Sequence, residues 1–167
     1  FEASLGAEIA DIDLASDLDA GTIKKLNDYW AEYLVLCIRG QNLSPQDFIK
    51  VGRIFGDPFR QIYGQFNHPD YPEIGLLTHK DSDIAGSGKR KIRGTSWHTD
   101  ASYFEKPPAG TMLFAITVPN EGGDTEFLSM RAAYKALSEE NKEKLCNLRS
   151  IHVYESSRSP RKLIKRS

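Results

Sequence analysis

The sequence predicts a mixed α/β fold with a mostly β core and flanking helices. In several stretches apolar residues recur every three or four positions, which is the spacing of an amphipathic helix. Elsewhere, short continuous apolar runs end at glycine, proline or a charged residue, as buried strands do. With 167 residues, 40% of them hydrophobic, the chain is long enough for one globular domain.

The first elements expected are a helix over residues 20–33 and a buried strand over residues 34–38. Helical spacing relates the apolar residues Ile23, Leu26, Trp30 and Tyr33. A second helix is expected to begin after Ser44, a hydroxyl cap that is followed by proline and, in the first turn, by an acid. The inward residues of this helix are expected to be Phe48, Val51 and Phe55.

Four strands are predicted in the rest of the chain from runs of apolar and β-branched residues. They cover residues 74–77, 111–118, 124–128 and 151–154. Two short helices, over residues 130–137 and 139–148, are expected after the hydroxyl caps Ser129 and Ser138.

The charge balance and the cysteines exclude several classes of protein. The 22 Lys and Arg against 23 Asp and Glu give a net charge of −1, whereas a nucleic-acid binder needs a basic excess. No apolar run approaches the ~18 residues of a membrane helix. Cys37 and Cys146 lie far apart in apolar patterns, which predicts buried free thiols and a reducing compartment.

Since no secretory leader is visible, we expect the protein in the cytoplasm.

The stretch over residues 96–100, Ser-Trp-His-Thr-Asp, contains two candidate metal ligands. In an extended segment, residues two apart lie on the same face, so the His98 imidazole and the Asp100 carboxylate are expected to project together. They are two of the three ligands of a 2-His-1-carboxylate site, which binds non-haem Fe(II) and leaves positions open for other ligands. Alone, the pattern is a weak signal, because a structural or surface pair has the same letters.

The sequence holds a second His-x-Asp, at His79 and Asp81, with a glycine-rich run after it. This copy leads into a loop of Gly, Ser and basic residues, and we interpret it as a solvated charge cluster. The run Gly86–Lys89 resembles part of a phosphate-binding loop, but such a loop needs an earlier glycine and a hydroxyl after the lysine. Asp83 and Arg90 stand at those positions, so the phosphate-loop interpretation fails.

Three motifs around the first copy follow one another at a characteristic spacing. They are Trp-His-Thr-Asp at 97–100, Pro-Pro-Ala-Gly at 107–110 and Gly-Gly-Asp-Thr at 122–125. Weaker matches lie upstream at residues 5–14, 39–45 and 55–56. Together they cover nearly the whole chain, which resembles the taurine dioxygenase (TauD/TfdA) family of Fe(II)- and 2-oxoglutarate-dependent dioxygenases.

The resemblance implies a fold, two cofactors and three site residues. Family members fold as a double-stranded β-helix, a jelly-roll barrel, and residues 1–167 would be the N-terminal portion of one such dioxygenase domain. His98 and Asp100 would bind Fe(II), and Thr125 would hydrogen-bond a carboxylate of the co-substrate 2-oxoglutarate. Thr125 is otherwise a β-branched strand residue after a Gly-Gly turn. The implied reaction hydroxylates a small organic substrate, for instance a sulfonate or another anion, and releases succinate and CO2.

Two features of the family have no counterpart in the chain. They are a distal histidine, the third iron ligand, and an arginine that pairs with the far carboxylate of 2-oxoglutarate; both lie downstream of residue 167 in family members. His152 follows a helix in a short predicted strand, which favours a structural role. As written the chain would not complete the site, which leaves an unseen C-terminal part or an inactive fragment as the alternatives.

The substrate is indicated less clearly. In taurine-specific members a His-Pro-x-Tyr-Pro segment contacts the sulfonate, which makes His68 and Tyr71 candidate substrate residues. This segment lies further along the chain than expected, and Gly94 stands where the family has an amide side chain, so taurine itself is in doubt. A surface-loop role for His68 is equally supported. The basic residues of 89–93 are either a solvated loop or a means of steering an anionic substrate.

Two interpretations from other classes stay open. A non-catalytic jelly-roll binding module would keep the fold without the metal. An interaction fragment would use the basic residues of 158–166 against an acidic partner, which the balanced overall charge disfavours. The expected partners are a small-molecule substrate and dioxygen, with no nucleic acid and no membrane, and a homo-oligomer is an open option.

Overall fold

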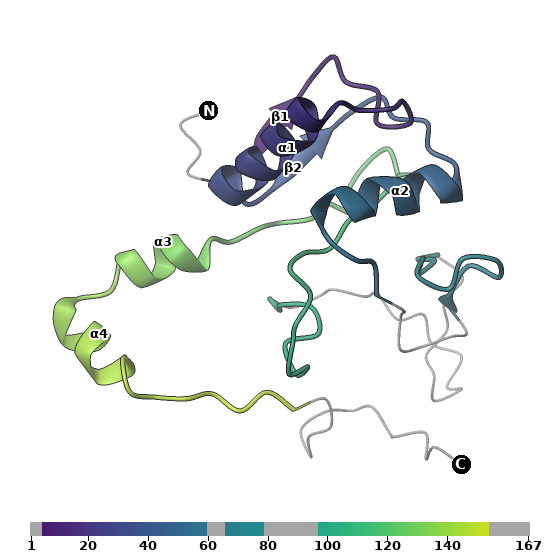
Figure 1. Cartoon of the computed structure of the whole chain (residues 1–167). Helices are drawn as coiled ribbons and strands as arrows, with labels where there is room; N and C mark the ends of the chain where they lie inside the picture. The colour runs from purple at the N-terminus through teal and green to yellow at the C-terminus, as the bar shows by residue number, and fades with distance from the viewer. Residues whose placement is uncertain (1–4, 60–65, 79–96, 154–167) are drawn as a thin grey trace, which may run out of the picture. The chain divides into compact units, whose positions relative to one another are not determined.

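The computed structural model describes residues 5–59, 66–78 and 97–153. These residues contain both helices and strands, as predicted, but the strands are two of three residues each, so the predicted mostly β core is not confirmed. In chain order the elements are β1 (Ala7–Ile9), α1 (Ala20–Tyr33), β2 (Leu36–Ile38), α2 (Pro45–Phe55), α3 (Met130–Lys135) and α4 (Glu139–Leu145). Figure 1 shows α1 lying along the small sheet made by β1 and β2.

The chain divides into two units. The first contains the residues up to Pro58 together with Met112–Leu148, and the second contains Phe59–Thr111 together with the residues from Arg149 onward. Every helix and strand assigned within the described ranges belongs to the first unit. The candidate metal ligands belong to the second.

The helix predicted over residues 20–33 is confirmed as α1. It begins after Asp19, whose carboxylate accepts a hydrogen bond from the Thr22 amide at 3.0 Å. It ends at Leu34, where φ is 67°, in the left-handed region, and the Leu34 amide still donates to the Trp30 carbonyl. Because Leu34 caps the helix, the strand predicted over 34–38 begins only at Leu36.

β2 pairs in parallel with β1, a strand that the sequence analysis missed. Ala7 lies opposite Leu36 and Ile9 lies opposite Ile38. Parallel neighbours need a crossover between them, and α1 supplies it. A salt bridge of 2.7 Å between Arg39 and Glu8 joins the two strands at the surface.

α2 confirms the second predicted helix and its cap. The Ser44 hydroxyl accepts from the Asp47 amide while the Asp47 carboxylate accepts from the Ser44 amide, a reciprocal capping box. The helix ends before Gly56. Of the residues predicted to face inward, Val51 is buried, with 1% of its surface exposed, and Phe48 and Phe55 are half-buried.

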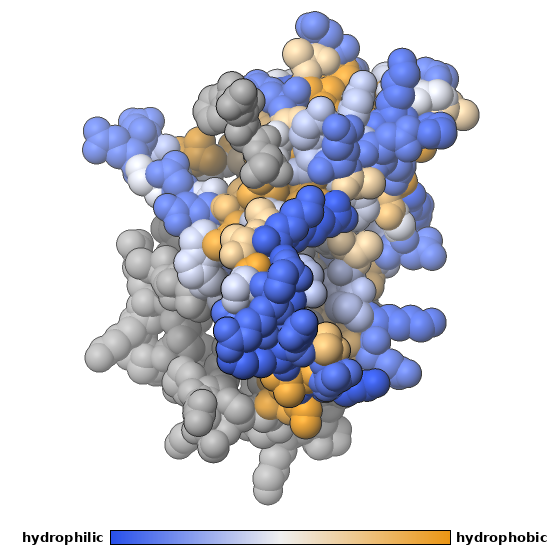
Figure 2. All heavy atoms as spheres, turned by 90° about the vertical axis from the view of Figure 1, so that its left-hand side faces the viewer, coloured by the Kyte–Doolittle hydropathy of each residue, from blue (hydrophilic) through white to orange (hydrophobic). Residues whose placement is uncertain are grey.

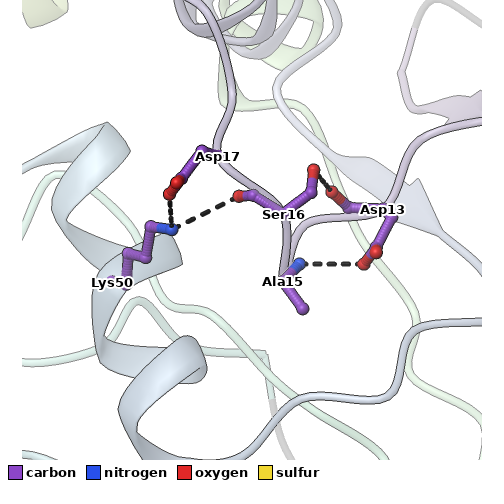
Figure 3. Close-up of polar contacts among 5 residues, drawn as sticks. All are labelled: Asp13, Ala15, Ser16, Asp17 and Lys50. Carbon is purple, nitrogen blue, oxygen red and sulfur yellow. Dashed lines mark hydrogen bonds and ion pairs between the residues drawn. The ribbon is translucent and has the colours of Figure 1, made fainter.

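A small core lies under α1 and α2. Its buried members are Leu14, Leu26 and Val51, with partly buried neighbours from β1, β2 and the loops around them. The loop between β1 and α1 is fixed to α2, because Lys50 Nζ donates to Asp17 Oδ1 at 2.6 Å and to the Ser16 carbonyl at 3.3 Å (Figure 3). Within this loop the Asp13 side chain accepts from the Ala15 amide.

The strands predicted in the second half of the chain are wrong for the described residues. Residues 111–118, 124–128 and 151–153 are assigned to no strand, and residue 154 lies outside the described ranges. Residues 74–77 contribute only one antiparallel bridge, between Gly75 and Asn67. An apolar run becomes a strand only when another segment supplies its hydrogen bonds. In residues 111–118 the apolar side chains are also solvent-exposed, Leu113 at 64% and Ile116 at 82%.

The two C-terminal helices are confirmed in shortened form. Ser129 caps α3 and Ser138 caps α4, as predicted: their hydroxyls accept hydrogen bonds from the Ala132 and Asn141 amides. Exposed apolar side chains lie along and beside these helices, among them Met130, Tyr134, Leu145 and Leu148. Figure 2 shows hydrophobic residues at the surface beside strongly hydrophilic ones.

The prediction that both cysteines are buried is wrong, although both are free thiols. Cys37 is exposed because alternate residues of a strand face opposite sides, and Cys37 lies between Leu36 and Ile38, which face the core. Cys146 is exposed just beyond α4. No helix among the described residues is long and apolar enough to cross a membrane.

Candidate metal centre

The side chains of His98 and Asp100 come together, as the spacing predicts. His98 Nε2 lies 3.3 Å from Asp100 Oδ1. The segment has no regular secondary structure up to residue 99, and a turn begins at Asp100, with Ala101 in the left-handed region at φ 49°. The chain therefore turns away immediately after Asp100, the second candidate ligand, and both side chains keep about half of their surface exposed, 55% and 52%.

The second oxygen of the Asp100 carboxylate has a partner of its own. Thr111 Oγ1 donates a hydrogen bond of 2.7 Å to Asp100 Oδ2. Thr111 follows the Pro-Pro-Ala-Gly motif, and sequence reasoning missed it because it was assigned only as the start of a strand. A hydroxyl directly after that motif is the signal that could have identified it.

The turn after Asp100 is held from two sides. Within the turn the Phe104 amide donates to the Ala101 carbonyl at 3.1 Å. From a distant part of the sequence, His152 Nδ1 lies 2.9 Å from the Ser102 hydroxyl. This contact gives His152 a hydrogen-bond partner, which agrees with the structural role that the sequence favours for this residue.

The donor set of His98 and Asp100 fits a divalent transition metal. Imidazole and carboxylate are borderline and hard ligands that suit such ions, Fe(II) among them. Two donors that each lie about 2.1 Å from one ion are about 3 Å apart at neighbouring corners of an octahedron, close to the separation found here. Within residues 5–59, 66–78 and 97–153, no third His, Cys, Asp or Glu joins them in a metal-binding group.

The substrate candidates His68 and Tyr71 lie together in a tight turn of the second unit. Their ring centroids are 5.1 Å apart, and His68 Nδ1 accepts a hydrogen bond of 3.2 Å from the Asp70 amide. The turn is closed by a bond of 2.8 Å from the His68 amide to the Ile74 carbonyl. The substrate role of the two residues stays a prediction, and the contacts themselves organise the turn.

Thr125 belongs to the first unit and is exposed in the irregular segment before α3. Gly122 and Gly123 precede it with φ of 72° and 78°, values that favour glycine, and the chain bends at residues 120 and 121. The role of Thr125 toward 2-oxoglutarate stays a prediction.

Several other residues singled out in the sequence lie outside the described ranges. They are His79, Asp81, the basic residues of 89–93 and those of 158–166.

Comparison with known proteins gives this geometry a context. A family model described as taurine catabolism dioxygenase TauD, TfdA family matches residues 1–166. The chain is 33% identical over 162 residues to an alpha-ketoglutarate-dependent 2,4-dichlorophenoxyacetate dioxygenase of Cupriavidus pinatubonensis, covering 91% of this chain and 56% of that protein. It is 30% identical over 152 residues to an alpha-ketoglutarate-dependent sulfate ester dioxygenase of Pseudomonas putida, covering 90% of this chain and 47% of that protein.

A solved structure is similar at the level of the fold. It is a protein of Burkholderia xenovorans assigned as an alpha-ketoglutarate-dependent taurine dioxygenase, with a TM-score of 0.70 and 25% identity. The match covers 88% of this chain and 51% of that one. The chain therefore spans about half the length of the relatives that it matches.

Proposed function

Because the chain belongs to the taurine catabolism dioxygenase TauD, TfdA family, we propose that it is part of an Fe(II)- and 2-oxoglutarate-dependent dioxygenase. The observation that carries the proposal is the convergence of the His98 imidazole and the Asp100 carboxylate, 3.3 Å apart, in the Trp-His-Thr-Asp segment that resembles the family motif. Both relatives reported above carry names that include alpha-ketoglutarate dependence.

In this proposal His98 Nε2 and Asp100 Oδ1 hold the metal at neighbouring positions. Both side chains are about half exposed, and in this proposal they are therefore accessible to co-substrate and substrate. Iron bound there would supply the activation of dioxygen, with decarboxylation of 2-oxoglutarate to succinate and hydroxylation of a substrate C–H bond. The hydroxyl of Thr125 would donate to a carboxylate of 2-oxoglutarate and orient it.

We infer a small organic anion as the substrate. The names of the two relatives refer to an aryloxy carboxylate and to sulfate esters, and both kinds of molecule are anionic. Hydroxylation beside the heteroatom of such a molecule gives an unstable product that breaks at that bond. His68 and Tyr71 are the proposed substrate contacts, and the basic residues of 89–93 are proposed to attract the anion.

The complete fold in this proposal is the double-stranded β-helix, to which residues 1–167 contribute the N-terminal portion of one domain. Support comes from the similarity to the Burkholderia xenovorans structure. We further expect the enzyme to work in the cytoplasm on small molecules, without nucleic acid or membrane.

Measurement of succinate tests the proposal. The protein at its natural length is incubated with Fe(II), 2-oxoglutarate and, in turn, an alkyl sulfate, an aryloxyacetate and taurine. We expect succinate above the substrate-free background with at least one of them, and loss of it in His98→Ala and Asp100→Ala. His79→Ala, which alters the second His-x-Asp, is the matched control and should stay active.

Two results would decide against the proposal. Full turnover in either ligand variant would show that the pair does not hold the iron. If the unsubstituted protein binds neither Fe(II) nor 2-oxoglutarate, the non-catalytic binding module becomes the better description.

A further inference from the structure

The two oxygens of the Asp100 carboxylate are not equivalent. Oδ1 lies beside His98 Nε2 at 3.3 Å, whereas Oδ2 accepts the hydrogen bond from Thr111 Oγ1 at 2.7 Å. One oxygen therefore faces the other candidate ligand, and the opposite oxygen is held by a hydroxyl eleven residues further along the chain.

The hydrogen bond restricts a side chain that would otherwise rotate. The terminal torsion of an aspartate is broad and has no sharp preference, and the Asp100 side chain is 52% exposed, so packing restrains it little. Threonine is well suited to restrain it, because its β-branched side chain has few rotamers and its hydroxyl direction is therefore well defined. Pro107 and Pro108 stiffen the chain that leads to Thr111, since each fixes its own φ.

The restraint leaves the charge of the carboxylate intact. A hydroxyl donates a hydrogen bond but brings no positive charge, unlike lysine or arginine. In the described part of the chain, no lysine or arginine forms a salt bridge with Asp100. An oriented carboxylate is well suited to bind a cation.

We propose that Thr111 is a positioning residue for the metal site: its hydroxyl holds Asp100 Oδ2 so that Oδ1 stays directed toward the ion shared with His98. This inference rests on the proposed function, because it assumes that the pair binds a metal. Ligating carboxylates are generally hydrogen-bonded from behind, and loss of such a partner typically weakens metal binding or activity by about 10–100-fold.

The competing explanation is that Thr111 only stabilises the loop from Ala101 to Gly110. In that case its loss would lower the thermal stability of the metal-free protein and leave the affinity of the folded protein for metal unchanged. The two explanations therefore differ in a binding measurement made on folded protein, without catalysis.

The experiment compares three variants of the protein at its natural length. Thr111→Val removes the hydroxyl and keeps the shape, Thr111→Ser keeps the hydroxyl, and Thr117→Val makes the same chemical change at an exposed threonine of the same segment. Binding of Mn(II), a redox-stable substitute for Fe(II), is titrated by electron paramagnetic resonance, and thermal unfolding of the metal-free protein is recorded in parallel.

We expect Thr111→Val to weaken Mn(II) binding about 10–100-fold, with Thr111→Ser and Thr117→Val close to the unsubstituted protein. Unchanged Mn(II) affinity in Thr111→Val, or a loss just as large in Thr111→Ser, would overturn the inference. Thr111→Ala provides the same comparison if Thr111→Val does not fold. His98→Ala and Asp100→Ala complete the set. If these two variants bind Mn(II) as tightly as the unsubstituted protein, the proposed function itself fails. If they lose Mn(II) binding while Thr111→Val keeps it, only the positioning role of Thr111 is refuted.

Discussion

Ser102 and His152 are 50 positions apart in the sequence, yet the Ser102 hydroxyl and His152 Nδ1 lie 2.9 Å apart. Ser102 stands two residues after Asp100, so the contact fixes the turn that follows the candidate ligands. The contact also gives His152 a hydrogen-bond partner in the protein, which is consistent with a structural role rather than that of a metal ligand.

Replacing His152 should leave metal binding largely intact. His152→Ala and Ser102→Ala remove the same exposed hydrogen bond, so each should lower the free energy of unfolding by about 0.5–1.5 kcal/mol. Denaturant unfolding and Mn(II) titration of both variants check this. Loss of Mn(II) binding in His152→Ala alone would contradict the structural role and make His152 a ligand.

Substitution of the most enclosed leucine should destabilise the first unit. Leu26 is 2% exposed in the core between α1 and its neighbours, and Leu26→Ala should cost about 2–5 kcal/mol because it leaves a cavity. Leu148→Ala, at a leucine that is 68% exposed, is the matched control and should change stability by less than about 0.5 kcal/mol. Chemical denaturation followed by circular dichroism measures the free energy of unfolding of both variants. Equal decreases in the two variants would contradict the position of Leu26 in the core.

Acidification should weaken α2 through its cap. Hydrogen bonds from the Ser44 hydroxyl and then from the Ser44 amide lower the pKa of the Asp47 carboxyl below its ordinary value. A carboxyl with a lowered folded-state pKa stabilises the fold above its unfolded-state pKa, and this contribution is lost as the pH falls from that value to the folded-state pKa. The stability difference between the unsubstituted protein and Asp47→Asn should therefore be present at neutral pH and shrink as the pH falls below the ordinary carboxyl pKa of 3.8.

Unfolding midpoints of the two proteins across this pH range measure the effect. A difference that stays constant on acidification would show that the Asp47 charge does not contribute. Ser44→Ala, which removes the hydroxyl that lowers the pKa most, should reduce the pH dependence in the same way.

The helices could be predicted from the sequence because their signals are local. Ser44, Pro45 and Asp47 lie within one turn, and the cap that they predict is present. The strand over residues 36–38 was predicted from its apolar run, but its pairing was not, because the partner of a strand can lie anywhere in the chain. The Leu36 partner of Ala7 is distant in sequence, so β1 was missed, and residues 111–118 have strand composition but no ladder within the described ranges.

The candidate site shows the same division between local and distant signals. The approach of His98 to Asp100 follows from a spacing of two residues, and it was predicted. Thr111 lies 11 residues after its partner Asp100, and His152 lies 50 residues after its partner Ser102. Periodicity relates only residues a few positions apart, so it predicts neither contact. Cys37 was assigned as buried because its neighbours are apolar, whereas strand alternation puts it on the opposite face.

Whether His98 and Asp100 hold one iron ion is tested most directly by the visible charge-transfer absorption of an Fe(II)–2-oxoglutarate complex. Fe(II) and 2-oxoglutarate are added without oxygen to the protein and to its His98→Ala, Asp100→Ala and His79→Ala variants. We predict the absorption band in the unsubstituted protein and in His79→Ala, and its absence in His98→Ala and Asp100→Ala. A band of undiminished intensity in either of these last two variants would contradict the account.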